Sequence, residues 1–369
     1  KWIFKNKSIM EISKSEYFKR QTTLPEIGEK GQELLQKAKV LVIGCGGLGS
    51  PIAIYLATSG IGTLHLVDFD NVTVSNLHRQ VFFKKDDVQH SKVSVLASEI
   101  QKRTPFTKVL VTNEAVDKNS ILSLISHYDI VVDGTDNLQI KYLINDACVV
   151  SKKPLVYGSL YKYDGYVATF NVLNGDGDYT CNLRDAFPTI ASDIPNCETA
   201  GTMNPIVGII AMLQVNEVIK LITKTGKLLT NQLLIYNVLE NSQLKMKLKK
   251  NKSINVETLF KNSIYLDESC KTQDSSLLIS SSELNKKLND PTIEIVSVLN
   301  NLDASIPFNV NQKIPYKDFD VNKFIPDFNK NYVIICNRGI TSYDVTLKIK
   351  TKFPSLNVFS LVEGIDGYV

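Results

Sequence analysis

Lys39-Val-Leu-Val-Ile-Gly-Cys-Gly-Gly-Leu-Gly-Ser50 opens the stretch that decides the fold of this chain, and Gly62-Thr-Leu-His-Leu-Val-Asp-Phe-Asp70 closes it. The apolar run stops at Gly44, and three more glycines precede an apolar helical pattern, which predicts a strand, a tight turn and the start of a helix. Backbone N–H groups and the helix dipole at such a turn favour a phosphate group. The next predicted strand ends at Asp68, where a ribose hydroxyl would lie. The stretch therefore predicts a nucleotide site without distinguishing NAD, FAD or ATP.

Strands and helices alternate through the first 160 residues, which predicts a parallel, doubly wound sheet. Beyond residue 160 an alternating stretch, a long apolar helix and two further strands predict an antiparallel extension. We expect an α/β fold, a Rossmann-like doubly wound sheet with this extension, plus a small α/β domain. The expected boundaries are 11–248 for the first domain, 249–282 for a polar linker and 283–369 for the second domain. The predicted strands are 40–43, 63–67, 109–112, 129–133, 155–158, 163–172, 233–236 and 244–248.

Composition narrows the class of protein. The 369 residues are 43% hydrophobic and 22% charged with a net charge of +4, as in a soluble globular protein of two or three domains. So mild a positive charge argues against nucleic acid as the main partner. We expect no membrane association, because no apolar stretch approaches the roughly 20 residues that span a bilayer. Six scattered cysteines form no Cys-x-x-Cys pair, which predicts no disulfide framework and favours the reducing cytoplasm.

Charged residues after the glycine turn favour a nucleoside triphosphate over a dinucleotide. Arg79 follows the predicted ribose carboxylate, Lys92 starts the next helix, and Asp136 follows the fourth strand. Open α/β sheets gather their ligands at these carboxyl ends of strands. Two cations would neutralise phosphate charge and the carboxylate would hold Mg²⁺. The alternative that stays open here is an NAD-dependent oxidoreductase.

These motifs resemble the MoeB/ThiF adenylyltransferases, relatives of the ubiquitin-activating enzymes, over about residues 15–245. The resemblance is carried by Arg20-Gln21, Gly44-x-Gly-Gly-x-Gly49, Asp68-x-Asp70, Ser75-Asn-Leu-His-Arg-Gln80, Lys92 and Asp133-x-Thr-Asp-Asn137. It implies that Arg20 acts on the triphosphate from across a homodimer interface. It also implies a set of residues that contact ATP or its Mg²⁺: Gly47, Asp68, Ser75, Asn76, Leu77, His78, Arg79, Lys92, Asp136 (the Mg²⁺ ligand) and Asn137.

The same resemblance implies a substrate and a catalytic thiol. The substrate would be a small ubiquitin-like sulfur carrier that ends in Gly-Gly and is activated as an acyl-adenylate. Cys197, in Pro195-Asn-Cys-Glu-Thr-Ala-Gly201, matches the thiol of a loop that crosses over the adenylate in the family. Many relatives hold structural zinc with two Cys-x-x-Cys pairs. Here only Cys181 and Cys270 stand at those places, and two thiols do not complete a tetrahedral site, so we expect no zinc.

The last 87 residues, about 283–369, resemble a rhodanese domain. Cys336-Asn-Arg-Gly-Ile-Thr-Ser342 is predicted to be a strand-to-helix loop whose N–H groups surround one sulfur, which suits a persulfide anion. Two departures from the pattern are Ser297-Val-Leu299 in place of an acidic motif and a shortened helix. The domain is therefore either active, specialised for its own partner, or vestigial.

We predict an enzyme that adenylates the carrier and converts it to a thiocarboxylate for molybdopterin biosynthesis. Cys336 would bring sulfur from a persulfide donor such as a cysteine desulfurase, and Cys197 would resolve the acyl disulfide. Two alternatives stay open beside the oxidoreductase: the same chemistry for thiazole (thiamine) biosynthesis, and a non-catalytic carrier-binding scaffold. The pathway itself is not readable from these residues.

Overall fold

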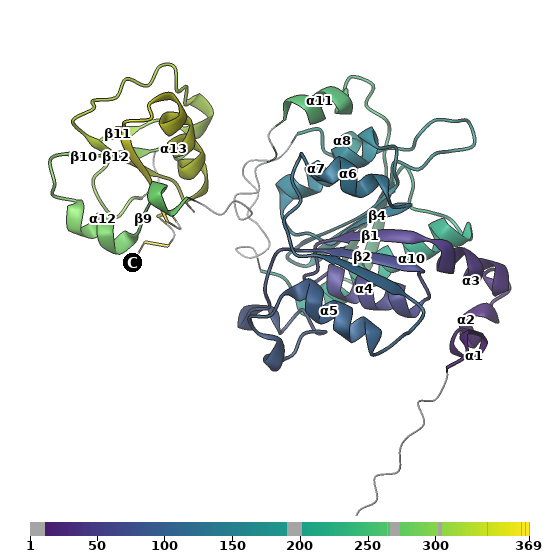
Figure 1. The fold of residues 1–369 in the computed structure, drawn as a ribbon. Helices are drawn as coiled ribbons and strands as arrows, with labels where there is room; N and C mark the ends of the chain where they lie inside the picture. Colours follow the sequence, from purple (N-terminus) through teal and green to yellow (C-terminus); the bar gives the residue numbers. More distant parts are fainter. Residues whose placement is uncertain are drawn as a thin grey trace, which may run out of the picture. The chain divides into compact units, whose positions relative to one another are not determined.

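A computed structural model of the protein describes residues 12–189, 201–263, 265, 274–301, 305–337, 339–362, 364–365 and 367–368. The chain divides into two compact units, Lys1–Asp267 and Glu268–Val369 (Figure 1). We describe each unit by itself.

Unit 1 is built on one eight-stranded sheet in the order β3-β2-β1-β4-β5-β6-β7-β8. The first five strands are parallel and the last three join by antiparallel pairing, as predicted. The strands are β1 (Lys39–Ile43), β2 (Thr63–Val67), β3 (Lys108–Thr112), β4 (Ile130–Asp133), β5 (Leu155–Tyr161), β6 (Asp164–Phe170), β7 (Gln232–Asn237) and β8 (Ser242–Lys247).

The switch point of this sheet lies between β1 and β4. From β1 the chain moves outward through β2 and β3, and then returns to place β4 and β5 on the other side of β1. Ile43, at the end of β1, pairs with Val67 of β2 and with Asp133 of β4. Since ligands of open α/β sheets bind where the strand order reverses, this edge is the expected place of the site.

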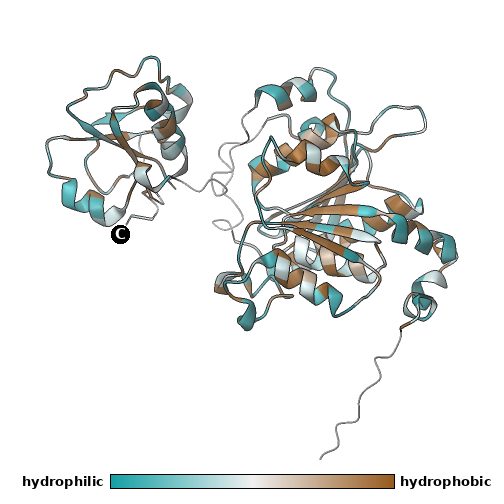
Figure 2. Ribbon diagram, in the orientation of Figure 1, coloured by the Kyte–Doolittle hydropathy of each residue, from teal (hydrophilic) through white to brown (hydrophobic). Residues whose placement is uncertain are grey.

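Helices cover both faces of the sheet (Figure 1). One layer contains α4 (Gly49–Thr58), α5 (Lys92–Gln101) and α10 (Asn204–Thr223), and the other contains α6 (Ile121–Ser126), α7 (Leu138–Val150) and α8 (Leu183–Ala186). Side chains along β1 point alternately to the two faces of the sheet. Val40 and Val42 join the core on the α4 side, and Leu41 and Ile43 join the core on the α7 side. Figure 2 shows the resulting apolar strands between the two layers of helices.

The expectation that no apolar stretch is long enough to span a bilayer was wrong for α10. This helix is 20 residues long and is apolar enough to cross a membrane by length and composition alone, with 50% of its apolar window buried. It packs against α4, β5 and β6, and its Gln214 and Glu217 side chains are buried in polar contacts with the sheet. We therefore assign α10 to the core of unit 1.

The predicted linker is partly folded. Residues 256–262 form α11 (Val256–Asn262), which packs on α7 through the buried side chains of Val256 and Phe260. Lys118 Nζ donates to the Lys261 and Ser263 carbonyls at 2.6 and 3.1 Å. The polar composition concealed a seven-residue helix that docks through two buried apolar side chains.

Unit 2 contains a five-stranded parallel sheet in the order β11-β10-β12-β13-β9. Its main helices are α12 (Ser281–Lys287) and α13 (Ile340–Lys352), and two apolar clusters pack on its two faces. The sheet confirms the predicted small α/β unit. The strands are β9 (Leu278–Ile279), β10 (Ile293–Ser297), β11 (Gln312–Lys313), β12 (Asn331–Ile335) and β13 (Asn357–Leu361).

Candidate nucleotide-binding site

The glycine turn after β1 is pressed against the turn after β4. Gly44 has a φ of +85°, and a Cβ built there would lie 2.7 Å from the Gly134 carbonyl carbon. A Cβ on Gly49 would lie 1.8 Å from the Gly44 oxygen. Only glycines allow these backbones to approach so closely. The two turns therefore form one surface at the switch point.

Asp68 fastens the end of β2 to this turn. Its Oδ2 accepts a hydrogen bond from the Cys45 backbone N at 2.6 Å, and its Oδ1 accepts one from the Asp70 backbone N at 2.8 Å. Burial raises the pKa of the Asp68 carboxyl, while the Lys92 ammonium and the two N–H donors oppose that rise. The carboxylate stands where a ribose hydroxyl could reach it beside the glycine turn.

Lys92 starts α5, and its ammonium is held by a neighbouring carboxylate. Its Nζ lies 2.7 Å from Asp70 Oδ2, with 6% of the Lys92 side chain and 46% of the Asp70 side chain exposed. The ammonium is thus placed close to Asp68 without a direct ion pair to it. A phosphate group would have to share this cation with Asp70 or displace that carboxylate.

The predicted Ser-Asn-Leu-His-Arg motif lies on a short loop after β2. Residues 74–76 form a 3-10 turn, and the Arg79 guanidinium donates to the Ser75 carbonyl at 3.0 Å and lies 3.2 Å from His78 Nε2. Val72 pairs with the backbone of Gln89 and His90, which closes the loop at its base. Arg79, Asn76 and Leu77 are half-buried, whereas Ser75 and His78 are exposed.

The turn after β4 presents one exposed carboxylate. Asp136 is exposed and makes no hydrogen bond or ion pair with any residue that the structure describes. Its neighbour Asn137 caps α7 by accepting a hydrogen bond from the Ile140 N at 3.1 Å. Asp133, three residues earlier, is fully buried and accepts bonds from Thr135 N and Oγ1 at 2.9 and 2.7 Å.

Sequence reasoning missed two buried polar side chains beneath this surface. Lys141 of α7 bonds to Asp133 Oδ2 at 2.9 Å, and Gln214 of α10 donates to the Asp133 carbonyl at 2.8 Å. Lys141 lies four residues after the helix cap, where a lysine is usually solvated, so its position in the sequence carries no signal of burial.

Arg20 does not reach this surface within one chain. It is exposed on α2 (Lys19–Thr22). This helix and the residues just before it are hydrogen-bonded to the loops that precede β2 and β3. Gln21 Nε2 donates to the Ser59 carbonyl at 3.0 Å, and Tyr17 OH donates to the Arg103 carbonyl at 3.1 Å. These loops lie at the opposite edge of the sheet from the carboxyl ends of the strands. Within one chain, Arg20 therefore lies away from the surface at the switch point.

The structure describes one of the two cysteines that are predicted to be reactive. Cys197 lies outside the described residues. Cys336 follows β12 in unit 2; it is buried, with its Sγ 3.2 Å from Ser342 Oγ. Ser342 in turn lies 2.9 Å from the buried Ser360 hydroxyl. The loop thus places the sulfur beside the first turn of α13, and the expected ring of N–H donors around it stays a prediction.

Few side chains in the described part of the chain are grouped so that they could bind a metal ion. Among the described residues, no group of three or more His, Cys, Asp or Glu side chains is arranged to hold a metal ion. Cys181 is buried, and burial raises its pKa to about 11. Asp178, three residues before Cys181, pairs with Lys250 at 2.8 Å. Cys270 lies outside the described residues, so the absence of zinc stays a prediction.

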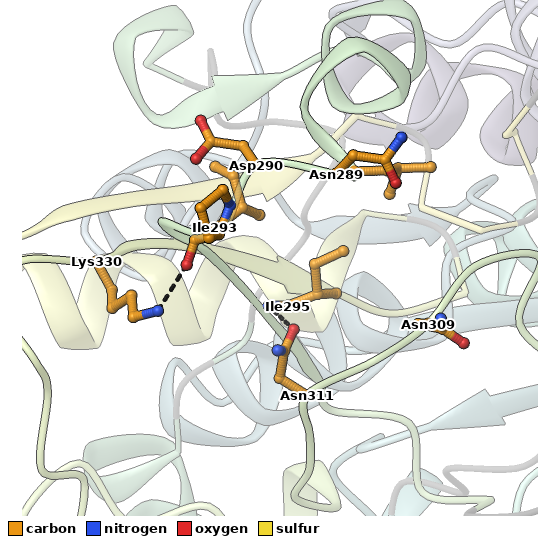
Figure 3. Close-up of a pocket in the computed structure, with 9 residues that line it drawn as sticks. Asn289, Asp290, Ile293, Ile295, Asn309, Asn311 and Lys330 are labelled. Carbon is orange, nitrogen blue, oxygen red and sulfur yellow. Dashed lines mark hydrogen bonds between the residues drawn. The ribbon is translucent and has the colours of Figure 1, made fainter.

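A separate pocket of about 250 Å³ lies in unit 2 at the start of β10 (Figure 3). Lys330 reaches across it to the Pro291 carbonyl at 2.6 Å, and Asn311 Oδ1 accepts from the Ile295 N at 2.8 Å. These bonds commit the Lys330 ammonium and the Asn311 oxygen to partners within the protein. Cys336 is not among the lining residues, because it lies at the other end of the parallel strands.

Comparison with known proteins agrees with the geometry of unit 1. The ThiF family matches residues 18–257, which is more than half of the chain. The chain belongs to the ThiF family. A "Sulfur carrier protein adenylyltransferase" from Thermus thermophilus is 37% identical over 236 residues, covering 63% of this chain and 87% of the relative. "Adenylyltransferase and sulfurtransferase MOCS3" from Dictyostelium discoideum is 42% identical over 225 residues, covering 60% of this chain and 52% of the relative.

Solved ThiF-like structures share the fold. Escherichia coli MccB with ATP is 26% identical with a TM-score of 0.54, covering 61% of this chain and 68% of that chain. MccB with a MccA variant is 24% identical with a TM-score of 0.58, covering 67% of this chain and 75% of that chain. The matched region spans about half the length of the MOCS3 relative.

Proposed function

We propose that unit 1 adenylates the C-terminal glycine of a ubiquitin-like sulfur carrier. The observation that carries this proposal is the exposed carboxylate of Asp136 beside the glycine turn, which has no partner among the described residues, in a ThiF-family chain. A carrier carboxylate oxygen would attack the α-phosphate of ATP, and the bond to pyrophosphate would break. Asp68 would bind the ribose, and Lys92 and Arg79 would face the phosphates.

The groups at the switch point fit a magnesium ion. Mg²⁺ prefers oxygen ligands, keeps several waters and is bound by one or two carboxylates together with substrate phosphates. Asp136 supplies one carboxylate that has no partner among the described residues, and the nearby Asp133 is bonded to Thr135 and Lys141. When bound, the ion would withdraw charge from the phosphates and so favour loss of pyrophosphate.

Unit 2 would supply the sulfur in this proposal. A Cys336 persulfide would attack the acyl-adenylate, release AMP and leave an acyl disulfide. The Cys197 thiolate would then attack Cys336 Sγ, releasing the carrier thiocarboxylate and leaving a Cys197–Cys336 disulfide for an external thiol to reduce. A persulfide sulfur donor of the cysteine desulfurase type would reload Cys336.

The position of Arg20 supports a homodimer as the working form, and we propose that it acts in the cytoplasm. An arginine at the opposite edge of its own sheet can reach triphosphate only in a partner copy. We favour molybdopterin biosynthesis as the pathway, since a relative from Gracilaria tenuistipitata, 34% identical over 275 residues, is named "Probable molybdopterin-synthase adenylyltransferase".

The test is ATP–pyrophosphate exchange with purified carriers of the molybdopterin and thiazole types. We expect exchange that depends on a carrier with an intact Gly-Gly end, and faster exchange with the molybdopterin type. Preference for the thiazole type would reassign the pathway. Carrier binding without exchange would favour a scaffold, and tight NAD binding without ATP binding would favour an oxidoreductase.

A further inference from the structure

The turn that follows β4 contains two carboxylates with opposite surroundings. Asp133 is fully buried, and Asp136 is exposed. A buried carboxylate is costly unless a cation and hydrogen-bond donors compensate it. Asp133 has both: Lys141 Nζ lies 2.9 Å from its Oδ2, and Thr135 N and Oγ1 bond to its Oδ1.

Lys141 joins three elements at this point. Besides Asp133 at the end of β4, its ammonium donates to the Gly158 carbonyl of β5 at 2.6 Å, and its own backbone belongs to α7. Only 3% of its side chain is exposed. The ammonium also lies 5.2 Å from the centre of the Tyr157 ring, a further favourable contact for a buried cation. Its surroundings leave this cation no direct contact with solvent or with a bound phosphate.

The other oxygen of Asp133 shapes the backbone that leads to Asp136. Its bonds to Thr135 close a turn over residues 133–135, while the Gly134 N donates to the Ile43 carbonyl at 2.8 Å. On the other side of the sheet, Gln214 holds the Asp133 carbonyl at 2.8 Å. Every polar group of Asp133 described here is thus committed to fixing this turn.

From this arrangement we infer that Lys141 is a positioning residue for the metal-binding carboxylate. It neutralises Asp133 within the protein, so that Asp133 neither binds the metal nor moves, and Asp136 alone stays available to Mg²⁺. Lys141 touches neither nucleotide nor metal; it acts through Asp133 and Thr135. The inference rests on the proposed function, because it assigns a role toward the Mg²⁺·ATP of that site.

The direct test measures Mn²⁺ binding in the presence of ATP by electron paramagnetic resonance, with no carrier and no turnover. Lys141→Met and Lys141→Gln should each weaken Mn²⁺ binding by about tenfold or more, the usual cost of losing a residue that orients a metal ligand. The Mg²⁺ concentration for half-maximal exchange should rise by the same factor. Asp133→Asn/Lys141→Met should recover most of the affinity, because the amide oxygen still accepts from Thr135 and no charge needs neutralising.

A matched control separates positioning from general stability. Glu217 on α10 is equally buried and accepts from Thr169 Oγ1 and Leu229 N, at the opposite edge of the sheet. Glu217→Gln should lower the melting temperature and leave Mn²⁺ affinity unchanged. Wild-type Mn²⁺ affinity in a folded Lys141 variant would overturn the inference, and so would failure of both single variants to fold, since the role would then be structural. Absence of Mn²⁺·ATP binding by the wild-type protein would instead overturn the proposed function.

Discussion

Asp68 Oδ2 and the Cys45 backbone N lie 2.6 Å apart, in a hydrogen bond that joins the end of β2 to the glycine turn after β1. The two groups come from the opening and closing segments of the stretch that predicts a nucleotide site. One carboxylate therefore shapes the turn, and in the proposed function it also binds the ribose.

Asp68→Ala should raise the KM for ATP by about tenfold or more, because it removes a charged acceptor of both the turn and the ribose. Asp68→Asn should have a smaller effect, since its amide oxygen still accepts from one N–H group. Initial rates of pyrophosphate exchange over a range of ATP concentrations measure both. Asp86→Ala, an exposed residue of the following loop, is the control. An unchanged KM in Asp68→Ala would remove Asp68 from the site.

Gly44→Ala should destabilise unit 1 strongly. The φ of +85° at this position costs a non-glycine residue about 1–3 kcal/mol, and the added Cβ would also lie 2.7 Å from the Gly134 backbone. Gly175→Ala is the matched control, since its Cβ would meet no atom within 4 Å. Thermal unfolding of the two variants should differ clearly, and equal melting temperatures would show that the two turns do not pack as described.

Glu99 should make unit 1 sensitive to acid. Hydrogen bonds from Arg103, Lys84 and Lys102 lower the pKa of this carboxyl from 4.5 to about 2. A carboxyl with a lowered pKa in the folded state contributes stability above its unfolded pKa and loses it as the pH falls. The free energy of unfolding should therefore drop between about pH 4.5 and 2. Denaturant titrations of Glu99→Gln should show a shallower drop over that range; the same slope in both proteins would contradict the prediction.

Cys336→Ala should keep exchange activity and abolish formation of the carrier thiocarboxylate, because the first needs only unit 1 and the second needs the persulfide. Mass spectrometry of the carrier after incubation with ATP and a persulfide donor measures the product. Cys148→Ala is the control, since that thiol is buried in the core of unit 1 and burial raises its pKa. Undiminished thiocarboxylate in Cys336→Ala would assign the sulfur step to another group.

Local pattern was enough to predict most of the fold. Strand β2 begins and ends at the predicted residues, because its apolar residues form one buried run between glycine and aspartate. Helix α7 starts directly after Asn137, whose side chain accepts a hydrogen bond from the Ile140 N. Polar composition was the weaker guide, since it concealed α11 within the expected linker.

The candidate site was predictable only in part. Motif order predicted Asp68 and Asp136, which follow β2 and β4 on either side of β1 because parallel strands share one carboxyl edge, and Lys92 at the start of α5. Two other features of the site depend on tertiary packing and could not be predicted from the sequence. The burial of Lys141 depends on β5 lying beside β4, and the distance of Arg20 from its own site depends on where α2 docks.

The most direct test of adenylation at the switch point is pyrophosphate exchange by Asp136→Ala. The side chain is exposed and has no partner among the described residues, so the variant should fold like the wild-type protein. Exchange should fall by about a hundredfold or more through loss of the metal ligand. Asp176→Ala, another exposed aspartate, should exchange at the wild-type rate. Wild-type exchange by Asp136→Ala would contradict adenylation at this site.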